Sequence, residues 1–384
     1  MFFFQLLQIA IGNRELFSQA PTVEEWHDLY VLAQKQAMVG IAFRGVERLP
    51  EGQRPPKSLL KQWYMVTERI KSRNADLDRK ALAVANKFLR DGFPGIVLKG
   101  QGIAQLYRVE FDNGQRATDN DQPEEEFSIS NSQFPIKKYR TPGDIDIWLK
   151  GDRKTILTYV RRHVTHCKPV YHHVDFPVID GLDIEIHFTP TWMNSPITNH
   201  RLQRWFRDYA EVTFSSSFED IPVPNAAFNR VYILVHIYRH LFAEGIGLRQ
   251  LLDYYYVLQQ GCTDEERADT MRVLRSLKMQ RFAGAVMWVL QHVFAMDDRY
   301  LLTAPDAREG RFLLTEIMQA GNFGQYDERL QHEQVVSALQ WGWRKVKRNF
   351  RFVRSYPSEV LWSPLFKLWH WGWRKRTQKT KTSK

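Results

Sequence analysis

Residues 141–149 constrain this chain most, because they place two carboxylates inside an apolar alternation. A strand turns successive side chains to opposite faces. One face then carries Ile145, Ile147 and Leu149, and the other Asp144, Asp146 and Trp148. Two carboxylates on one face repel each other unless a cation compensates them. The natural cation is a divalent metal, and Mg²⁺ takes carboxylate and phosphate oxygens at such sites. The alternative is a strand whose polar face is solvated.

A second segment repeats this pattern. The apolar runs 171–179 and 182–188 are separated by Asp180 and Gly181, which is a strong hairpin signal. The second run turns Asp183, Glu185 and His187 to one face. If this strand lies beside the first, Glu185 supplies a third carboxylate, either as a metal ligand or as a general base. An ordinary half-exposed hairpin is the alternative.

A short apolar run at residues 95–98 predicts a buried strand. Lys99 follows it, and Gly100, Gln101 and Gly102 then lead into a predicted helix. A glycine turn between a strand and a helix lets backbone amides approach a phosphate, and a lysine adds charge. Such turns also occur for purely structural reasons.

The chain of 384 residues is long enough for two or three domains. Residues 1–92 read as helical, with a capping box at Thr22 and Glu25 and a long helix from about 57 to 90. An α/β region spans 93–223, interrupted at 109–139 by a polar, acidic insertion that predicts a mobile loop or small flap. Residues 224–340 are helical again.

Two pairs of polar residues in the second helical region can each be interpreted in more than one way. His236 and His240 have the i,i+4 spacing of a zinc pair, but packed or hydrogen-bonded histidines are favoured because no third ligand is near in sequence. Arg249 and Asp253 have the same spacing and predict a surface or inter-helix ion pair.

The net charge of +11 resides in the tail. Residues 341–384 hold 13 Lys and Arg against one acid, which leaves 41 basic and 42 acidic residues elsewhere. The tail also holds six of the 12 Trp, and it contains two copies of Trp-Gly-Trp-Arg-Lys. An anionic membrane surface, a nucleic acid, or docking of the tail onto its own protein would each account for this composition. Because the basic charge is confined to the tail, a reading of the whole protein as a basic nucleic-acid binder loses its support.

Two cysteines far apart in sequence argue against a disulfide scaffold. We therefore expect a cytoplasmic protein, with the tail allowing a peripheral place at the inner membrane surface. Residues 1–12 are apolar but too short to span a bilayer, and they predict a packed helix.

The chain carries Lys99-Gly100 after a strand, then Arg140 and Gly143-Asp144-Ile145-Asp146 on a strand, and then Glu185-Ile186-His187 on a later strand. This order resembles a family of uncharacterised bacterial nucleotidyltransferases. This family lies within the DNA polymerase beta-like superfamily. The resemblance covers roughly residues 25–300 and extends to the helices with His236, His240, Arg249 and Asp253. It implies an α+β fold, a nucleotidyltransferase-like mixed β-sheet with packed helices, flanked by N-terminal helices and a C-terminal helical domain.

The resemblance also implies roles for residues. Two Mg²⁺ (or Mn²⁺) ions would be held by Asp144, Asp146 and Glu185, the catalytic residues. The nucleotide would contact Lys99, Gly100, Gln101, Gly102 and Gly143. Arg140, by its charge and position, is expected to neutralise the triphosphate. His173, Asp183 and His187 are candidates for contacts with the acceptor or for auxiliary roles. The superfamily's usual Gly-Ser turn is replaced here by Lys-Gly-Gln-Gly, so a serine contact to phosphate is missing.

The expected reaction is attack of an acceptor hydroxyl on the α-phosphate of an NTP, with release of pyrophosphate. The acceptor is open between a sugar or polysaccharide precursor, a protein and an RNA end. One rival is a non-catalytic NTP-binding scaffold attached to a membrane by its tail. The other is a toxin-like nucleotidyltransferase acting on tRNA or protein.

Overall fold

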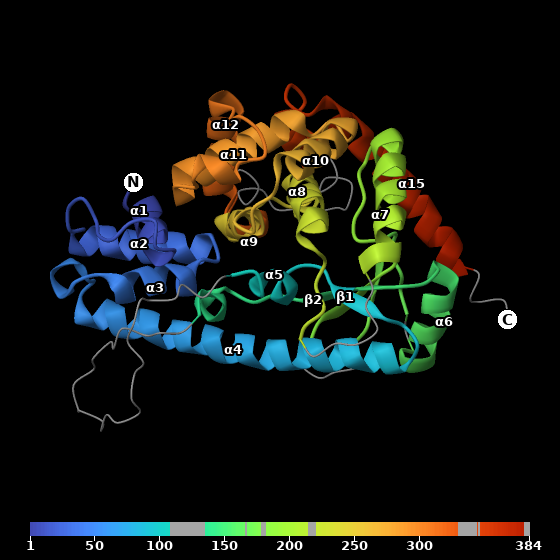
Figure 1. Cartoon of the computed structure of the whole chain (residues 1–384), viewed down its shortest axis with the longest axis horizontal. Coiled ribbons are helices and arrows are strands. Elements are labelled where there is room, and N and C mark those ends of the chain that lie inside the picture. The colour runs from blue at the N-terminus through green and yellow to red at the C-terminus, as the bar shows by residue number, and fades with distance from the viewer. Residues whose placement is uncertain are drawn as a thin grey trace.

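Three layers make up the molecule in the computed structural model (Figure 1). A long helix runs along one side, a small sheet lies on it, and a helical assembly covers the opposite side. The structure describes residues 1–107, 135–165, 167–177, 182–213, 220–328, 344 and 346–379. The Asp180-Gly181 turn lies outside this part of the chain.

The N-terminal region is helical, as predicted. Its elements are α1 (Phe2–Ala10), α2 (Val23–Lys35), α3 (Val39–Arg48), the short η1 (Glu51–Gln53) and the 34-residue α4 (Lys57–Arg90). Thr22 and Glu25 form the predicted capping box at the start of α2. The polar middle of α4 has a structural use, because the side chain of Asn74 donates to the carbonyls of Lys138 and Arg140.

The sheet has the strand order β1-β2-β4-β3. Its strands are β1 (Gly95–Val97), β2 (Ile145–Leu149), β3 (His173–Asp175) and β4 (Ile184–His187). β2 pairs antiparallel with β1 and parallel with β4, and β3 pairs antiparallel with β4, which confirms the predicted hairpin. The apolar face of β2 packs with α4 and α6 (Arg153–His163) in one hydrophobic core.

The opposite face of the sheet is covered by helices. This half contains α5 (Gln101–Ala104), η2 (Ile136–Tyr139), α7 (Pro196–Thr213), α8 (Ala226–Ala243), α9 (Leu248–Leu258), α10 (Asp264–Ser276), α11 (Gln280–Phe294), η3 (Asp298–Tyr300), α12 (Ala307–Ala320), η4 (Asn322–Gly324) and α15 (Pro357–Lys379). A second core joins these helices to α1, α2 and α3. The N- and C-terminal helical regions therefore share one interior, although the α/β region separates them in sequence.

Two segments differ from expectation. Residues 196–213 form the helix α7, although their mixed composition gave no helical prediction; Leu202 and Phe206 on it are buried, and Phe206 packs against Phe228 of α8. The acidic insertion was predicted as a loose segment through residue 139, yet its last residues pack as η2 with Ile136 and Tyr139 buried. Its residues 109–134 lie outside the described part.

The tail's second aromatic-basic repeat lies on α15, which runs toward α6 in Figure 1. Arg153 of α6 lies over the Trp373 ring of α15 at 4.6 Å. The first repeat, residues 341–345, lies almost wholly outside the described part. Among the described helices, none is both long and apolar enough to cross a membrane.

Candidate active site

One face of the sheet gathers the polar residues that the sequence singled out. Parallel pairing sets Asp146 of β2 directly beside Glu185 of β4, and antiparallel pairing sets His187 beside His173 of β3. Side chains of directly paired residues share a face. Ligand atoms of Asp146, Glu185 and His187 lie within 4.8 Å of one another. The predicted convergence of the two strands is therefore present.

Lys99 enters this cluster from the end of β1. Its Nζ lies 3.3 Å from Asp144 Oδ2 and 3.0 Å from Asp146 Oδ2. Burial opposes its charge, but the attraction of Asp146, Asp144 and Glu185 outweighs burial and raises the pKa of Lys99. Asp146 is fully buried, whereas the Asp144 side chain is 39% exposed. Lys99 thus supplies the compensating cation that the carboxylate pair requires.

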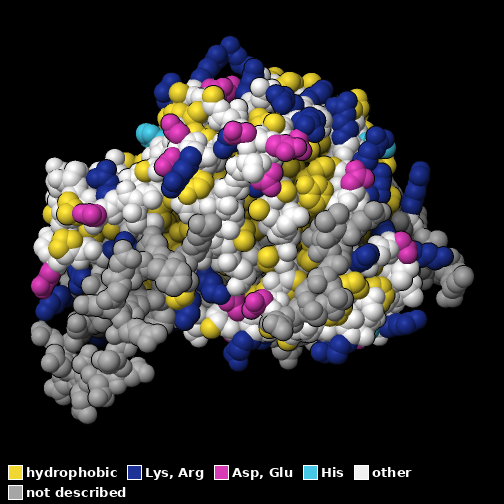
Figure 2. All heavy atoms as spheres, in the orientation of Figure 1, with side chains coloured by type: hydrophobic (Ala, Val, Ile, Leu, Met, Phe, Trp, Pro, Cys, Tyr) yellow, Lys and Arg dark blue, Asp and Glu magenta, His cyan; other side chains and the backbone are white. Residues whose placement is uncertain are grey.

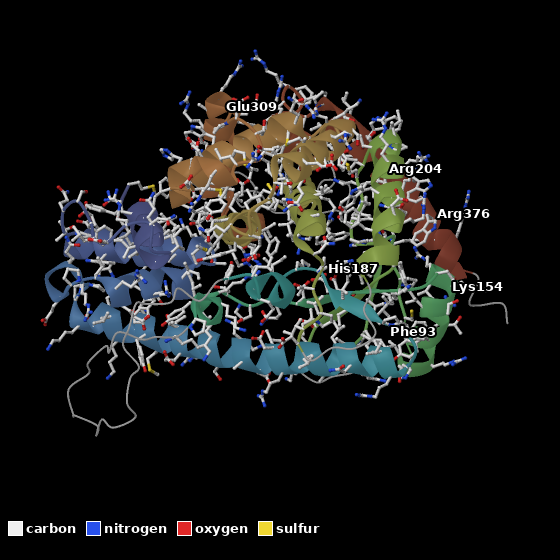
Figure 3. All side chains as sticks on the ribbon, viewed as in Figure 1. Phe93, Lys154, His187, Arg204, Glu309 and Arg376 are labelled. Carbon is white, nitrogen blue, oxygen red and sulfur yellow. The ribbon has the colours of Figure 1, made fainter. Side chains whose placement is uncertain are left out.

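His187, whose position is labelled in Figure 3, contacts a carboxylate on β2 and another on β4. Its Nε2 lies 2.8 Å from Asp146 Oδ1 and 3.4 Å from Glu185 Oε2. Burial works against protonation, but hydrogen bonds to Asp146 and Glu185 prevail and raise the pKa of His187 to about 9. Burial also opposes ionisation of Glu185, but the hydrogen bond from His187 and the nearby cations outweigh it and lower the pKa of Glu185 to about 2. Glu185 is therefore ionised at neutral pH, which suits a cation ligand better than a general base.

Two further histidines extend the cluster across β3. His172 Nε2 lies 2.9 Å from His173 Nδ1, which lies 3.2 Å from Glu185 Oε2. Burial lowers the pKa of both imidazoles, so both are neutral at pH 7. These two histidines and Glu185 form a second group able to hold a metal. His172 also packs on Trp192, at a centroid distance of 3.9 Å.

The segment that leads into β2 is held by α9. Asp253 accepts bonds from Nε and Nη2 of Arg140, both at 2.7 Å, and one from the Tyr107 hydroxyl at 2.7 Å. Arg249 donates to the carbonyls of Thr141 and Pro142. The expected pairing of Arg249 with Asp253 is wrong, because Arg140 occupies both oxygens of Asp253. Arg140 is buried in this pair, so its guanidinium is already bonded to Asp253, and its expected contact with a triphosphate stays a prediction.

The predicted glycine turn at residues 99–102 is present, and Gly100, Gln101 and Gly102 each have a different structural role in it. Gly100 has φ of 59° and ψ of −112°, a conformation that needs glycine. A side chain at Gly102 would place its Cβ 2.5 Å from the Val97 carbonyl oxygen, so this glycine allows α5 to pack on β1. The Gln101 side chain is buried and donates to Asp78 of α4 at 2.6 Å. One end of the Gln101 side chain is thus already bonded to α4, and its expected contact with a nucleotide stays a prediction.

The remaining predicted residues lie at the margin of the cluster. Gly143 precedes Asp144 and lies against Arg249, whose Nη1 is 3.7 Å from the position of a Cβ there. Asp183 is exposed before β4, and its carbonyl accepts from the Ile145 amide. His236 and His240 pack on each other with ring centroids 4.4 Å apart, and His240 lies 3.4 Å from Glu244.

Sequence reasoning missed the contribution of α8. The Arg239 guanidinium lies 4.0 Å from the centroid of the Trp192 ring. It also interacts electrostatically with the carboxylates of Glu185 and Asp146. Burial lowers the pKa of Arg239, and its Nε is buried without a hydrogen-bond partner among the described residues. The available signal was a set of polar groups at i, i+3 and i+4 inside the largely apolar stretch 231–243, namely His236, Arg239 and His240.

The protein has a nucleotidyltransferase-like fold, in which helices pack on a small mixed sheet. One face of this sheet carries the clustered carboxylates. The chain belongs to the family described as uncharacterised nucleotidyltransferase, whose model matches residues 22–109 and 128–295. This membership confirms the resemblance and supports nucleotidyl transfer as the general activity, with an NTP as substrate. The match omits residues 110–127, inside the acidic insertion, and ends before the tail. No curated protein and no solved structure matches the chain.

The donor set fits a divalent metal. Carboxylate oxygens suit Mg²⁺ and Mn²⁺, whereas imidazole nitrogen suits transition ions better than Mg²⁺. His187 Nε2 lies beside both Asp146 and Glu185, and His173 Nδ1 lies beside Glu185, so imidazole nitrogens accompany two of the three carboxylates. Lys99 shares the Asp144 and Asp146 oxygens that an ion would take, so its ammonium and an ion would compete for them.

Proposed function

We propose that this protein transfers an NMP from an NTP to an acceptor hydroxyl and releases pyrophosphate. The observation that carries the proposal is the register of β2 and β4, which sets Asp146 beside Glu185, with Lys99 Nζ 3.0 Å from Asp146 Oδ2. Like charges are held close here by neighbouring strands, an arrangement with an evident use in binding a divalent cation and phosphates.

We assign metal binding to Asp144, Asp146 and Glu185, with two ions of Mg²⁺ or Mn²⁺. Such ions neutralise phosphate charge and orient the attacking and leaving oxygens. The low pKa of Glu185 keeps its carboxylate ionised for this purpose. His187 holds Asp146 and Glu185 in register through its ring nitrogen, which makes it a positioning residue.

The phosphates are bound by Lys99 and Arg239 in this proposal. Lys99 lies at Asp144 and Asp146, so its ammonium would face the phosphate oxygens of an NTP bound at these carboxylates. Arg239 on α8 interacts electrostatically with Asp146 and Glu185. Among the described residues, no ion pair joins Arg239 to a carboxylate. The Lys99–Gly102 turn adds backbone amides. In the transfer, the acceptor oxygen bonds to the α-phosphorus as the bond to the bridging oxygen of pyrophosphate breaks, and the hydroxyl proton passes to solvent.

The acceptor stays open between a sugar or polysaccharide precursor, a protein and an RNA end. The cytoplasm is the proposed location, supported by the two free cysteines, Cys167 and Cys262. The alternatives are a non-catalytic NTP-binding scaffold and a toxin-like enzyme acting on tRNA or protein. The crowded carboxylates favour catalysis over a scaffold.

Transfer of label from α-³²P NTP, in Mg²⁺ or Mn²⁺, tests the proposal. Asp146→Asn removes one buried charge and is expected to lower the rate by about a hundredfold or more. Asp208→Asn, at an exposed position on α7, is the matched control and should keep the wild-type rate. Equal rates for wild type and Asp146→Asn would exclude catalysis at this site.

A further inference from the structure

The helix α15 exposes apolar side chains in a concentrated patch. Fourteen large apolar side chains are exposed among the described residues, and six of them lie on this one helix: Leu361, Trp362, Leu365, Leu368, Trp369 and Trp371. Exposed apolar residues are ordinary when scattered, but a contiguous patch marks an interaction site.

The patch has a helical geometry. Leu361, Leu365 and Leu368 are 62%, 54% and 67% exposed, and their spacing of i, i+4 and i+7 places them in one stripe. Another side of α15 is already occupied. There Phe366 packs on Tyr171 and Trp192, with ring centroids 5.9 Å apart in both cases. Docking onto the protein therefore accounts for one face of α15 and leaves the leucine stripe in solvent.

Basic residues accompany this stripe. Lys367, Arg374, Lys375 and Arg376 are all exposed on α15. The helix contains one acid, Glu359, which is buried and accepts from the amides of Asn194 and Ser195. The charged side chains that α15 exposes are therefore all basic. Figure 2 shows Lys and Arg side chains along the edge where α15 runs, and Figure 3 places Lys154, Arg204 and Arg376 on that edge.

We propose that α15 is an interfacial helix that docks this protein on an anionic lipid bilayer. The leucine stripe and the exposed tryptophans enter the headgroup boundary, and the basic residues contact anionic headgroups. Leucine favours lipid over nucleic acid, because single-stranded nucleic acids are bound by aromatic stacking and cations and gain little from an aliphatic stripe. The proposal is independent of the catalytic one, since α15 supplies none of the proposed metal or phosphate ligands.

Flotation of the full-length protein with lipid vesicles tests this surface. Phosphatidylcholine vesicles with phosphatidylglycerol should bind the protein, vesicles of phosphatidylcholine alone should bind it weakly, and salt should reduce binding. The double variant Leu365→Glu/Leu368→Glu should lose about tenfold or more in affinity. Arg374→Gln/Lys375→Gln/Arg376→Gln should lose the preference for the anionic lipid. Circular dichroism and thermal unfolding establish that each variant is folded.

The matched control is Val31→Glu/Met65→Glu, two exposed apolar residues on α2 and α4. It should bind vesicles as the wild type does. Equal binding by the Leu365→Glu/Leu368→Glu variant would overturn the proposal, as would binding of a single-stranded RNA oligonucleotide in place of vesicles. Label transfer to a soluble acceptor should survive the leucine substitutions, so failure of docking and failure of catalysis are separable.

Discussion

At the scale of residues, the proposed function assigns Arg239, together with Lys99, to the phosphates. Arg239→Met should weaken NTP binding by about tenfold or more, because a charge-assisted bond to phosphate is lost. Arg204→Met on α7 is the control and should bind NTP normally. Titration of a fluorescent NTP in Ca²⁺, which limits turnover, measures the affinity. Equal affinities for Arg239→Met and the wild type would remove Arg239 from the phosphate site.

The raised pKa of His187 makes stability depend on pH in the metal-free protein. Between pH 6.5 and 9 the folded protein keeps a proton on His187 that the unfolded chain has released. The contribution is therefore fully present below pH 6.5 and lost as the pH rises through 9. We expect the free energy of unfolding to fall by on the order of 3 kcal/mol across this window.

Urea unfolding in a chelator at several pH values measures this loss. His187→Gln should flatten the profile between pH 6.5 and 9, while His200→Gln, at an exposed position, should leave it unchanged. A profile in His187→Gln that still follows the wild type would show that another group titrates there.

At the scale of elements, α9 positions the strand that carries the aspartates. Asp253 is buried and binds Arg140 and Tyr107, just before β2 and just after α5. Asp253→Asn leaves the Arg140 charge buried without its partner, and we expect a loss of about 3–5 kcal/mol in the free energy of unfolding. The exposed pair of Asp269 with Arg272 is the matched control, and Asp269→Asn should cost about 0–1 kcal/mol.

Chemical denaturation measures both variants. A loss for Asp253→Asn no larger than that of Asp269→Asn would mean that α9 does not anchor the segment before β2. A functional readout sharpens the test, because a displaced Asp144 should also weaken Mn²⁺ binding.

At the scale of the whole molecule, the first helix belongs to the C-terminal core. The Asn13 side chain donates to the Tyr255 hydroxyl at 2.8 Å and to the Phe294 carbonyl at 2.6 Å, and Gln8 donates to the Val293 carbonyl. Leu6 is fully buried in the same core. The helix α1 therefore forms part of the interior of this fold, as the apolar composition of residues 1–12 predicted.

Leu6→Ala should therefore destabilise the protein by about 2–5 kcal/mol. Hydrogen exchange should show lower protection in α11 as well as in α1 and α3, since they share one core. Leu16→Ala, at a 48% exposed position, should have little effect. Loss of protection confined to the N-terminal helices would show that the two regions unfold independently.

The strand pairs of the site could be predicted because their information is local. Alternation along β2 and β4 puts Asp146, Glu185 and His187 on polar faces whatever surrounds them, and the Asp180-Gly181 signal pairs β3 with β4. Capping residues such as Thr22 likewise mark helix starts within a few positions. The composition of residues 196–213 carried no such local signal, so α7 was missed.

Sequence alone thus determined the helical regions, the polar strand faces and the family to which they point, since these depend on periodicity and short motifs. Tertiary structure decided which charges meet. Arg140 is 113 positions from Asp253, and nothing near either residue favours that pairing over Arg249 with Asp253. Packing of α9 beside α5 brings the first pair together, and packing of α8 over the sheet brings Arg239 to the carboxylates. Electrostatic partners depend on distances in space, which only the folded chain fixes.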